Sequence, residues 1–107
     1  MPARRDIEAA LQNTLDRFGL TKHDDYRELV RLALTAIAND PEALPAKHRD
    51  DLHLDVLIFH IGRTGRKARH FFVYRIADDG VVEVARLLYD GMDIVKHLPA
   101  DYLDPGD

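Results

Sequence analysis

Hydrophobic residues recur at steps of three and four between residues 2 and 39, which is the period of an amphipathic helix. A first helix is predicted from Pro2 to Gly19, because proline suits a first helical position and glycine ends the run. A second helix is predicted after Thr21, a candidate N-cap, and ends before Pro41. The two apolar stripes consist of Ile7, Ala10, Leu11, Leu15 and Phe18, then Tyr26, Leu29, Val30, Ala33, Leu34 and Ile37. The short connection predicts an antiparallel helical hairpin whose apolar face needs a covering layer.

The second half of the chain changes to runs rich in β-branched and aromatic residues. Such runs cover residues 54–61, 68–77 and 81–89, after a proline-containing connection over residues 40–51. The last two runs are joined by Asp-Asp-Gly at 78–80, and Asp-Gly favours a hairpin because a left-handed turn residue is needed there. The pattern predicts three antiparallel strands that cover the helices.

The second of these strands is apolar on both faces, and a sheet buried on both sides needs two covers. One face of that strand carries Phe71 and Val73, and the other carries Phe72, Tyr74 and Ile76. We expect residues 90–98 to supply part of the second cover and a partner chain to supply the rest. The expected fold class is α+β, with an N-terminal antiparallel helical hairpin packed on a three- to four-stranded antiparallel sheet and a short C-terminal tail. One domain is expected to span residues 1–107.

Composition agrees with one small globular domain. The chain has 107 residues, of which 46% are hydrophobic, and a formal charge of −4. It has no cysteine, so disulfides and thiolate metal sites are excluded. Asp6 and Glu8 interrupt the start of the chain where a signal peptide would be apolar, and no run is long enough to span a membrane. A cytoplasmic protein is expected.

Basic residues gather between His60 and Arg75, where no carboxylate occurs. The five cations there are Arg63, Arg66, Lys67, Arg69 and Arg75. Such a cluster in an acidic chain indicates a surface for an anionic partner, although a solvated loop would have the same composition. Arg75 and Arg86 lie in predicted strands, where arginine is uncommon unless it faces a partner or pairs with an acid. The candidate acids are Glu83, Asp90 and Asp93.

No cofactor and no metal are expected. The six histidines lack the spacing of a helical metal site. Asp50, Asp51, His53 and Asp55 are close in sequence but lie in a loop and at a strand start. The run GRTGRK at 62–67 lacks the spacing and the following helix of a phosphate-binding loop.

An ordered set of short motifs runs through the second half of the chain. It reads R-H-x-x-x-Y-R at 69–75, V-x-V-x-R-x-L at 82–88, M-D at 92–93 and H-L at 97–98, behind a helical segment at 3–19. In this order the motifs resemble the ParE branch of the RelE/ParE toxin superfamily, the toxins of bacterial type II toxin–antitoxin pairs. The family pattern differs at two points: it has a strand before the first helix, and a histidine where this chain has Tyr89.

The resemblance implies a toxin that traps DNA gyrase with its DNA cleaved and that catalyses no reaction itself. A cognate ParD-like antitoxin with a ribbon-helix-helix domain would neutralise it in a hetero-oligomer, and the pair would serve plasmid stabilisation. No membrane partner and no sequence-specific DNA binding by this chain alone are expected. The residues expected to bind the target are Arg63, Arg66, Lys67, Arg69, Arg75 and Arg86.

Two alternatives remain open. A ribosome-dependent endoribonuclease of the RelE type would use Tyr89, Arg86 and His70 as its catalytic residues, because RNA cleavage needs acid–base groups and a stabilised phosphate. In the ParE interpretation Tyr89 only ends a strand and caps the core. The second alternative is a relative that binds antitoxin without being toxic, which the sequence pI of about 5.8 favours.

Overall fold

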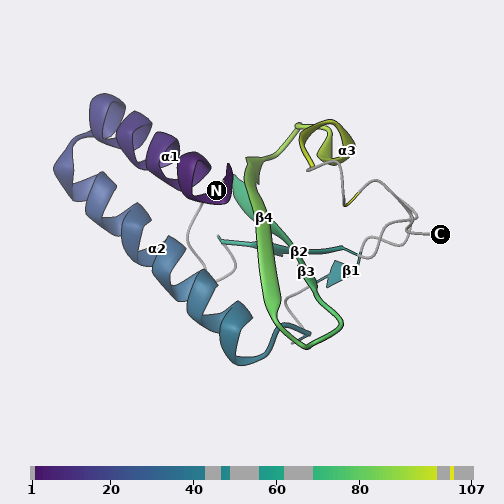
Figure 1. The fold of residues 1–107 in the computed structure, drawn as a ribbon. Helices are drawn as coiled ribbons and strands as arrows, with labels where there is room; N and C mark the ends of the chain where they lie inside the picture. The colour runs from purple at the N-terminus through teal and green to yellow at the C-terminus, as the bar shows by residue number, and fades with distance from the viewer. Residues whose placement is uncertain (1, 43–46, 49–55, 62–68, 99–101, 103–107) are drawn as a thin grey trace.

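The structure is a computed structural model that describes residues 2–42, 47–48, 56–61, 69–98 and 102. Two long helices come first and a four-stranded antiparallel sheet follows, with strand order β1-β2-β3-β4 (Figure 1). The elements are α1 (Pro2–Phe18), α2 (Leu20–Asn39), β1 (Lys47–His48), β2 (Leu57–His60), β3 (His70–Ile76), β4 (Val82–Tyr89) and α3 (Ile94–His97). The predicted α+β class, with a helical hairpin before the sheet and a short C-terminal tail, is confirmed.

The helical hairpin is tighter than the sequence indicates. Gly19 alone separates α1 from α2 and has φ 87°, a left-handed conformation that reverses the chain at one residue. Its N–H donates to the carbonyl of Leu15, and its own carbonyl accepts from His23. The predicted N-cap at Thr21 is therefore wrong, since α2 already begins at Leu20 and no side chain caps it.

The β3–β4 hairpin follows the predicted turn. The N–H of Gly80 donates to the carbonyl of Ala77, and the N–H of Ala77 donates to the carbonyl of Val81. With φ 84° at Gly80, this is a type I turn closed by a glycine bulge. A second bulge interrupts the strands, because Val73 pairs with Arg86 whereas Tyr74 pairs with Val84.

One face of the sheet packs on the helical hairpin. Its buried residues come from α2 and all three longer strands, and the largest are Phe72 and Tyr74 of β3. The Tyr74 hydroxyl donates to the carbonyl of Pro41, which follows α2. This bond fixes the end of the hairpin to the centre of the sheet.

The opposite face is covered by the C-terminal strap, a name used here for residues 92–98 together with Tyr102. Ile94 and Leu98 are buried against the sheet, and Met92 and Tyr102 pack at the border. The sheet residues beneath them are Val56, Ile58, Phe71, Val73, Ala85 and Leu88. The tail thus supplies the second cover, as predicted. The further cover expected from a partner is not needed over β3, whose residues 71–74 are all buried.

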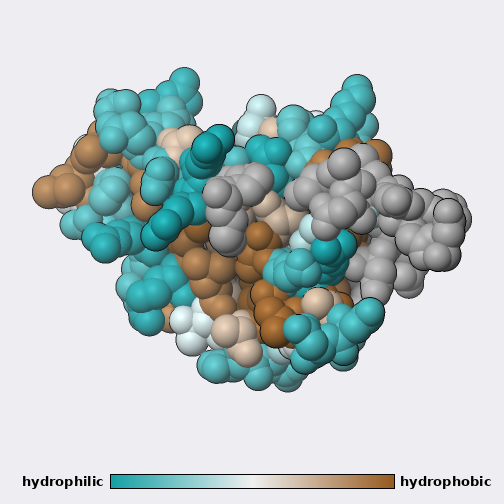
Figure 2. Space-filling model, viewed as in Figure 1, coloured by the Kyte–Doolittle hydropathy of each residue, from teal (hydrophilic) through white to brown (hydrophobic). Residues whose placement is uncertain are grey.

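The end of the helical hairpin has no such cover. Phe18 and Leu20 flank the turn, and each is 65% exposed. In Figure 1 the turn between α1 and α2 lies beyond the sheet, and Figure 2 shows a brown patch at that left-hand end of the molecule. The apolar stripe of α1 therefore extends beyond the sheet, which buries only the rest of the stripe. None of the described helices is long and apolar enough to cross a membrane.

Candidate target-binding site

Arg86 joins three parts of the fold. Its Nε and Nη2 donate to the two carboxylate oxygens of Asp6, at 2.6 and 2.9 Å, and its Nη1 donates to the carbonyl of His97 at 2.9 Å. The Arg86 side chain is 24% exposed and that of Asp6 is 17% exposed. The hydrogen bonds that Arg86 donates to the Asp6 carboxylate raise the pKa of Arg86 above its ordinary value. We call this arrangement the Arg86 clasp, since it ties α1, β4 and the C-terminal strap together.

Asp6 also accepts a hydrogen bond from the backbone at the outer edge of the sheet. Its Oδ2 accepts a hydrogen bond of 3.0 Å from the backbone N–H of Leu87. That N–H points away from β3, so the carboxylate replaces a neighbouring strand at this position. Sequence reasoning missed Asp6, because Asp6 and Arg86 stand 80 positions apart and no local pattern links them.

Arg75 is also held within the fold. Its Nη2 and Nε donate to the carboxylate of Glu83 across the hairpin, at 3.2 and 3.3 Å. Its guanidinium lies 3.8 Å from the centre of the Tyr102 ring, and the Tyr102 hydroxyl donates to the carbonyl of Glu83. Among the acids that the sequence offered as partners, Glu83 is the one that pairs with Arg75. Both strand arginines thus have structural roles, and their contact with a target stays a prediction.

Among the three described residues of the predicted target-binding set, Arg69 is the exposed one. It lies just before β3, and its carbonyl accepts from the N–H of Asp90 at 2.8 Å. Arg75 lies six positions further along the extended chain, a distance of about 20 Å. The described arginines of the predicted target-binding set therefore do not form one cluster. Arg63, Arg66 and Lys67 lie outside the described residues.

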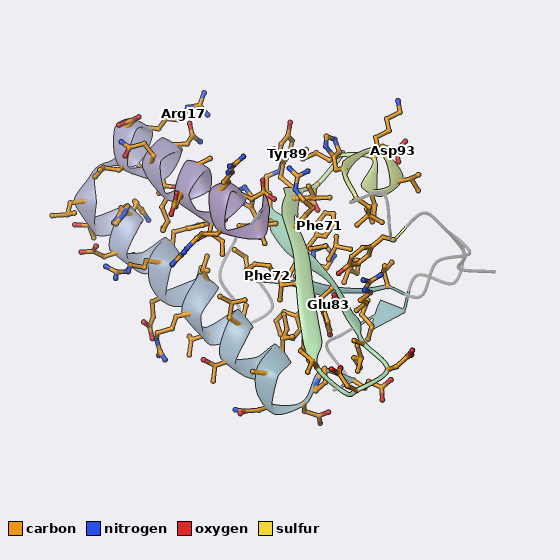
Figure 3. The ribbon with its side chains drawn as sticks, viewed as in Figure 1. Arg17, Phe71, Phe72, Glu83, Tyr89 and Asp93 are labelled. Atoms are coloured by element: carbon orange, nitrogen blue, oxygen red, sulfur yellow. The ribbon has the colours of Figure 1, made fainter. Side chains whose placement is uncertain are left out.

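An aromatic cluster lies where α2 meets the ends of β3 and β4. The His70 ring is 5.4 Å from that of Tyr26 and 6.2 Å from that of Tyr89, with both pairs edge-on. Burial lowers the pKa of His70, and the Asp90 carboxylate opposes this effect. Tyr89 ends β4, as expected, but is 51% exposed. It lies at the upper end of β4 in Figure 3 and does not cap the core.

Tyr26 was predicted only as an apolar residue of the second helix. Its hydroxyl is buried and has no hydrogen-bond partner among the described residues. Burial raises the pKa of this phenol, so it remains protonated. An unpartnered buried hydroxyl beside a half-buried histidine is a departure from simple core packing. No sequence signal distinguishes Tyr26 from its apolar neighbours.

The residues predicted for RNA cleavage are only partly brought together. His70 and Tyr89 are cross-strand neighbours, whereas the guanidinium of Arg86 is bonded to Asp6. A cleavage site needs a cation that is free to stabilise the phosphate. In the described part of the chain, no three metal-binding side chains of the His, Cys, Asp or Glu type come together.

Comparison with known proteins identifies the family. The sequence model of one protein family, described as the ParE toxin of the type II toxin–antitoxin system parDE, matches residues 1–94 of this chain. No curated protein shows a significant match to the chain. The matched residues include α1, α2, the four described strands, and Arg75 and Arg86 with their carboxylate partners. The chain therefore belongs to the ParE toxin family of type II toxin–antitoxin systems.

Proposed function

We propose that this ParE toxin inhibits growth by poisoning DNA gyrase, and that it traps the enzyme with its DNA cleaved. A cognate ParD-like antitoxin with a ribbon-helix-helix domain neutralises it in the cytoplasm as a hetero-oligomer. The pair serves plasmid stabilisation. Family membership supports the toxin–antitoxin part, and the Arg86 clasp supports a toxin without catalysis of its own.

The clasp is the observation that carries the proposal. Each of the three guanidinium nitrogens of Arg86 donates a hydrogen bond inside the fold, two to Asp6 and one to the carbonyl of His97. Turning it toward a phosphate would leave a half-buried carboxylate without its partner, which is costly. This favours a toxin that acts by binding.

The contact with the target involves the basic segment between β2 and β3. The N–H of Ile61 donates to the carbonyl of His70 at 3.1 Å, so the two ends of this segment lie side by side. The exposed Arg69 lies at this end of the sheet. We expect it to meet anionic groups of the gyrase–DNA complex together with the other cations of the segment, which lie outside the described residues. Arg75 and Arg86 act indirectly by holding the strands.

The second candidate is a ribosome-dependent endoribonuclease. It is favoured by the contact of His70 with the exposed Tyr89, since imidazole and phenol are groups that transfer protons. The third candidate, a toxin-like protein that only binds antitoxin, is favoured by the acidity of the chain.

Replacing Tyr89 with phenylalanine distinguishes the two toxic mechanisms. The change keeps the ring and removes only the hydroxyl, so we expect gyrase poisoning to continue nearly unchanged. A nuclease that used this hydroxyl would lose on the order of a hundredfold in cleavage rate. Wild type and Tyr89→Phe are induced at matched levels, with plasmid topology and transcript integrity read in parallel. Loss of both toxicity and transcript cleavage in the variant would overturn the gyrase proposal.

A further inference from the structure

Tyr89 presents an exposed aromatic ring at one end of the sheet. It is 51% exposed, although it lies on the sheet face that packs on the helices, as Leu87 does two positions earlier. Its edge-on contact with His70, at 6.2 Å between ring centres, supports the ring from one side, and His70 in turn contacts Tyr26. Figure 3 shows Tyr89 at the upper end of β4, between α1 and α3. A ring supported in this way loses less conformational freedom when a ligand binds.

The first turn of α1 brings two cations to the same end of the sheet. Arg4 and Arg5 are both exposed there. This turn lies beside the end of β4, because Asp6, which follows it, accepts from a backbone N–H of that strand. Arg69 is exposed at the start of β3, and its carbonyl accepts from the N–H of the residue after Tyr89. The end of β4 that carries the exposed ring thus has cations on both of its edges.

The charge changes sign from one end of the β3–β4 hairpin to the other. In the first turn of α1, at the start of β3 and over residues 89–97, the exposed cations are Arg4, Arg5, Arg69 and Lys96, and the exposed carboxylates are Asp90 and Asp93. The turn at the opposite end of the hairpin carries Asp78 and Asp79, both exposed. An anionic ligand is therefore attracted to the end with Tyr89, although the whole chain has a formal charge of −4.

An exposed ring among cations suits an unpaired nucleic-acid strand. Aromatic side chains stack on the faces of unpaired bases, and arginines neutralise the phosphates beside them. A duplex hides the faces of its bases, so it could use the cations alone. An acidic protein segment would also use only the cations. The ring therefore favours the unpaired strand over these other anions.

We propose that the Tyr89 platform, a name for Tyr89 with Arg4, Arg5 and Arg69, binds single-stranded DNA. One unpaired base stacks on the Tyr89 ring, and the arginines hold the neighbouring phosphates. This inference rests on the proposed function, since DNA that gyrase has cleaved has free strand ends, and it names DNA as the part of the complex that the toxin contacts. Stacking needs the ring of Tyr89, whereas proton transfer in a nuclease would need its hydroxyl.

Fluorescence anisotropy with a labelled oligothymidine of about ten nucleotides tests the platform directly. We expect Tyr89→Ala to weaken binding roughly fivefold to a hundredfold, the usual effect of losing one stacked base. Tyr89→Phe keeps the ring and should bind within about twofold of wild type. The inference is overturned if the wild-type protein does not bind, if Tyr89→Ala binds as well as wild type, or if both variants lose affinity equally.

Two charge variants give an independent measurement. Arg69→Ala should reduce the slope of log affinity against log salt concentration by about 0.7, the contribution of one phosphate contact on a single strand. Arg17→Ala removes the same charge at the far end of α1, as Figure 3 shows, and serves as the control. Equal slopes for Arg69→Ala and wild type overturn the inference. Should Tyr89→Ala lose its folded circular dichroism spectrum, these two variants decide.

Titrations with other nucleic acids identify the ligand. A duplex that binds as tightly as the oligothymidine would show that the ring is not used. An oligouridine that binds at least about tenfold more tightly would assign the platform to RNA. Either result overturns the assignment to single-stranded DNA.

Plasmid topology after induction of the wild-type toxin judges the proposed function separately. Cleaved plasmid in cells, without oligothymidine binding by the purified protein, would refute the platform and leave gyrase poisoning in place. Oligothymidine binding with uncleaved plasmid would refute gyrase poisoning and leave the platform in place.

Discussion

His70 is half-buried in an aromatic cluster. It is enclosed by Tyr26 from α2 and by Tyr89 and Asp90 from the end of β4. Burial lowers its pKa in the folded state, although Asp90 opposes the shift. The unfolded chain therefore takes up a proton more readily at this position, and protonation disfavours folding.

The stability of the protein should consequently fall in mild acid. The contribution of His70 is fully present above its unfolded pKa, near 6.5, and is lost as the pH falls from there toward the lower folded value. In His70→Phe this part of the pH dependence should disappear. Urea unfolding of both proteins between pH 8 and pH 5 measures it. Parallel curves for the two proteins would show that His70 titrates alike in both states.

Charge reversal of the basic segment tests target contact. Arg66→Glu with Arg69→Glu should abolish growth inhibition yet leave folding and antitoxin binding near normal, because Arg69 is exposed, Arg66 belongs to a predicted loop, and charges at such positions contribute little to stability. Arg17→Glu with Arg27→Glu makes the same charge change at exposed positions of the helical hairpin and serves as the control. Growth is compared at matched expression. Full toxicity of the Arg66 and Arg69 variant would place the target contact elsewhere.

At the scale of elements, the Arg86 clasp determines how α1 and the C-terminal strap are held on β4. Arg86→Ala should lower the free energy of unfolding by about 2–3 kcal/mol, because it leaves the half-buried Asp6 carboxylate without its cation. Asp6→Asn should cost less, since the amide oxygen still accepts from Leu87. Urea denaturation of both variants and of the double variant measures the coupling. Purely additive losses would contradict a direct interaction.

The sequence predicted those elements whose information is local. The β3–β4 hairpin follows from its Asp-Gly turn, and the pairing of Arg75 with Glu83 follows from that hairpin, because the turn fixes which residues face each other. The two helices follow from their periodic apolar residues. The start of α2 was misjudged because glycine at position 19 reverses the chain without a polar cap.

Features that depend on distant parts of the chain could not be predicted. The two-residue strand β1 carries no periodicity and exists through its pairing with Leu57 and Ile58. The Asp6–Arg86 pair and the contact of Tyr26 with His70 join residues that become neighbours only after the layers have packed. The sequence thus found the residues of the aromatic cluster on the strands but missed the one on α2.

For the whole molecule, the reason for antitoxin binding differs from the one that the sequence offered. Residues 71–74 of β3 are buried on both faces of the sheet, and the most exposed large apolar side chains in the described part of the chain are Phe18 and Leu20 at the end of the helical hairpin. An antitoxin segment that is disordered when free would fold on such sites as a helix and an extended stretch.

Antitoxin binding should raise the melting temperature. A partner that binds only the folded state adds about 2.7 kcal/mol at a concentration one hundred times its Kd. For a chain of 107 residues this corresponds to a rise of several degrees. Thermal unfolding with and without the neighbouring gene product measures the shift. An unchanged melting temperature at saturating concentration would contradict the assignment of that product as the antitoxin.

The position of the C-terminal strap in the chain has a consequence for biosynthesis. Leu98 and Tyr102 follow all the described strands in the sequence, so the second face of the sheet can be covered only after nearly all of the described chain has been made. Arg86 can donate to the carbonyl of His97, and Arg75 can pack on the ring of Tyr102, only after these residues have been made. We therefore expect the complete fold, and any toxicity that depends on it, to appear only when synthesis is nearly finished.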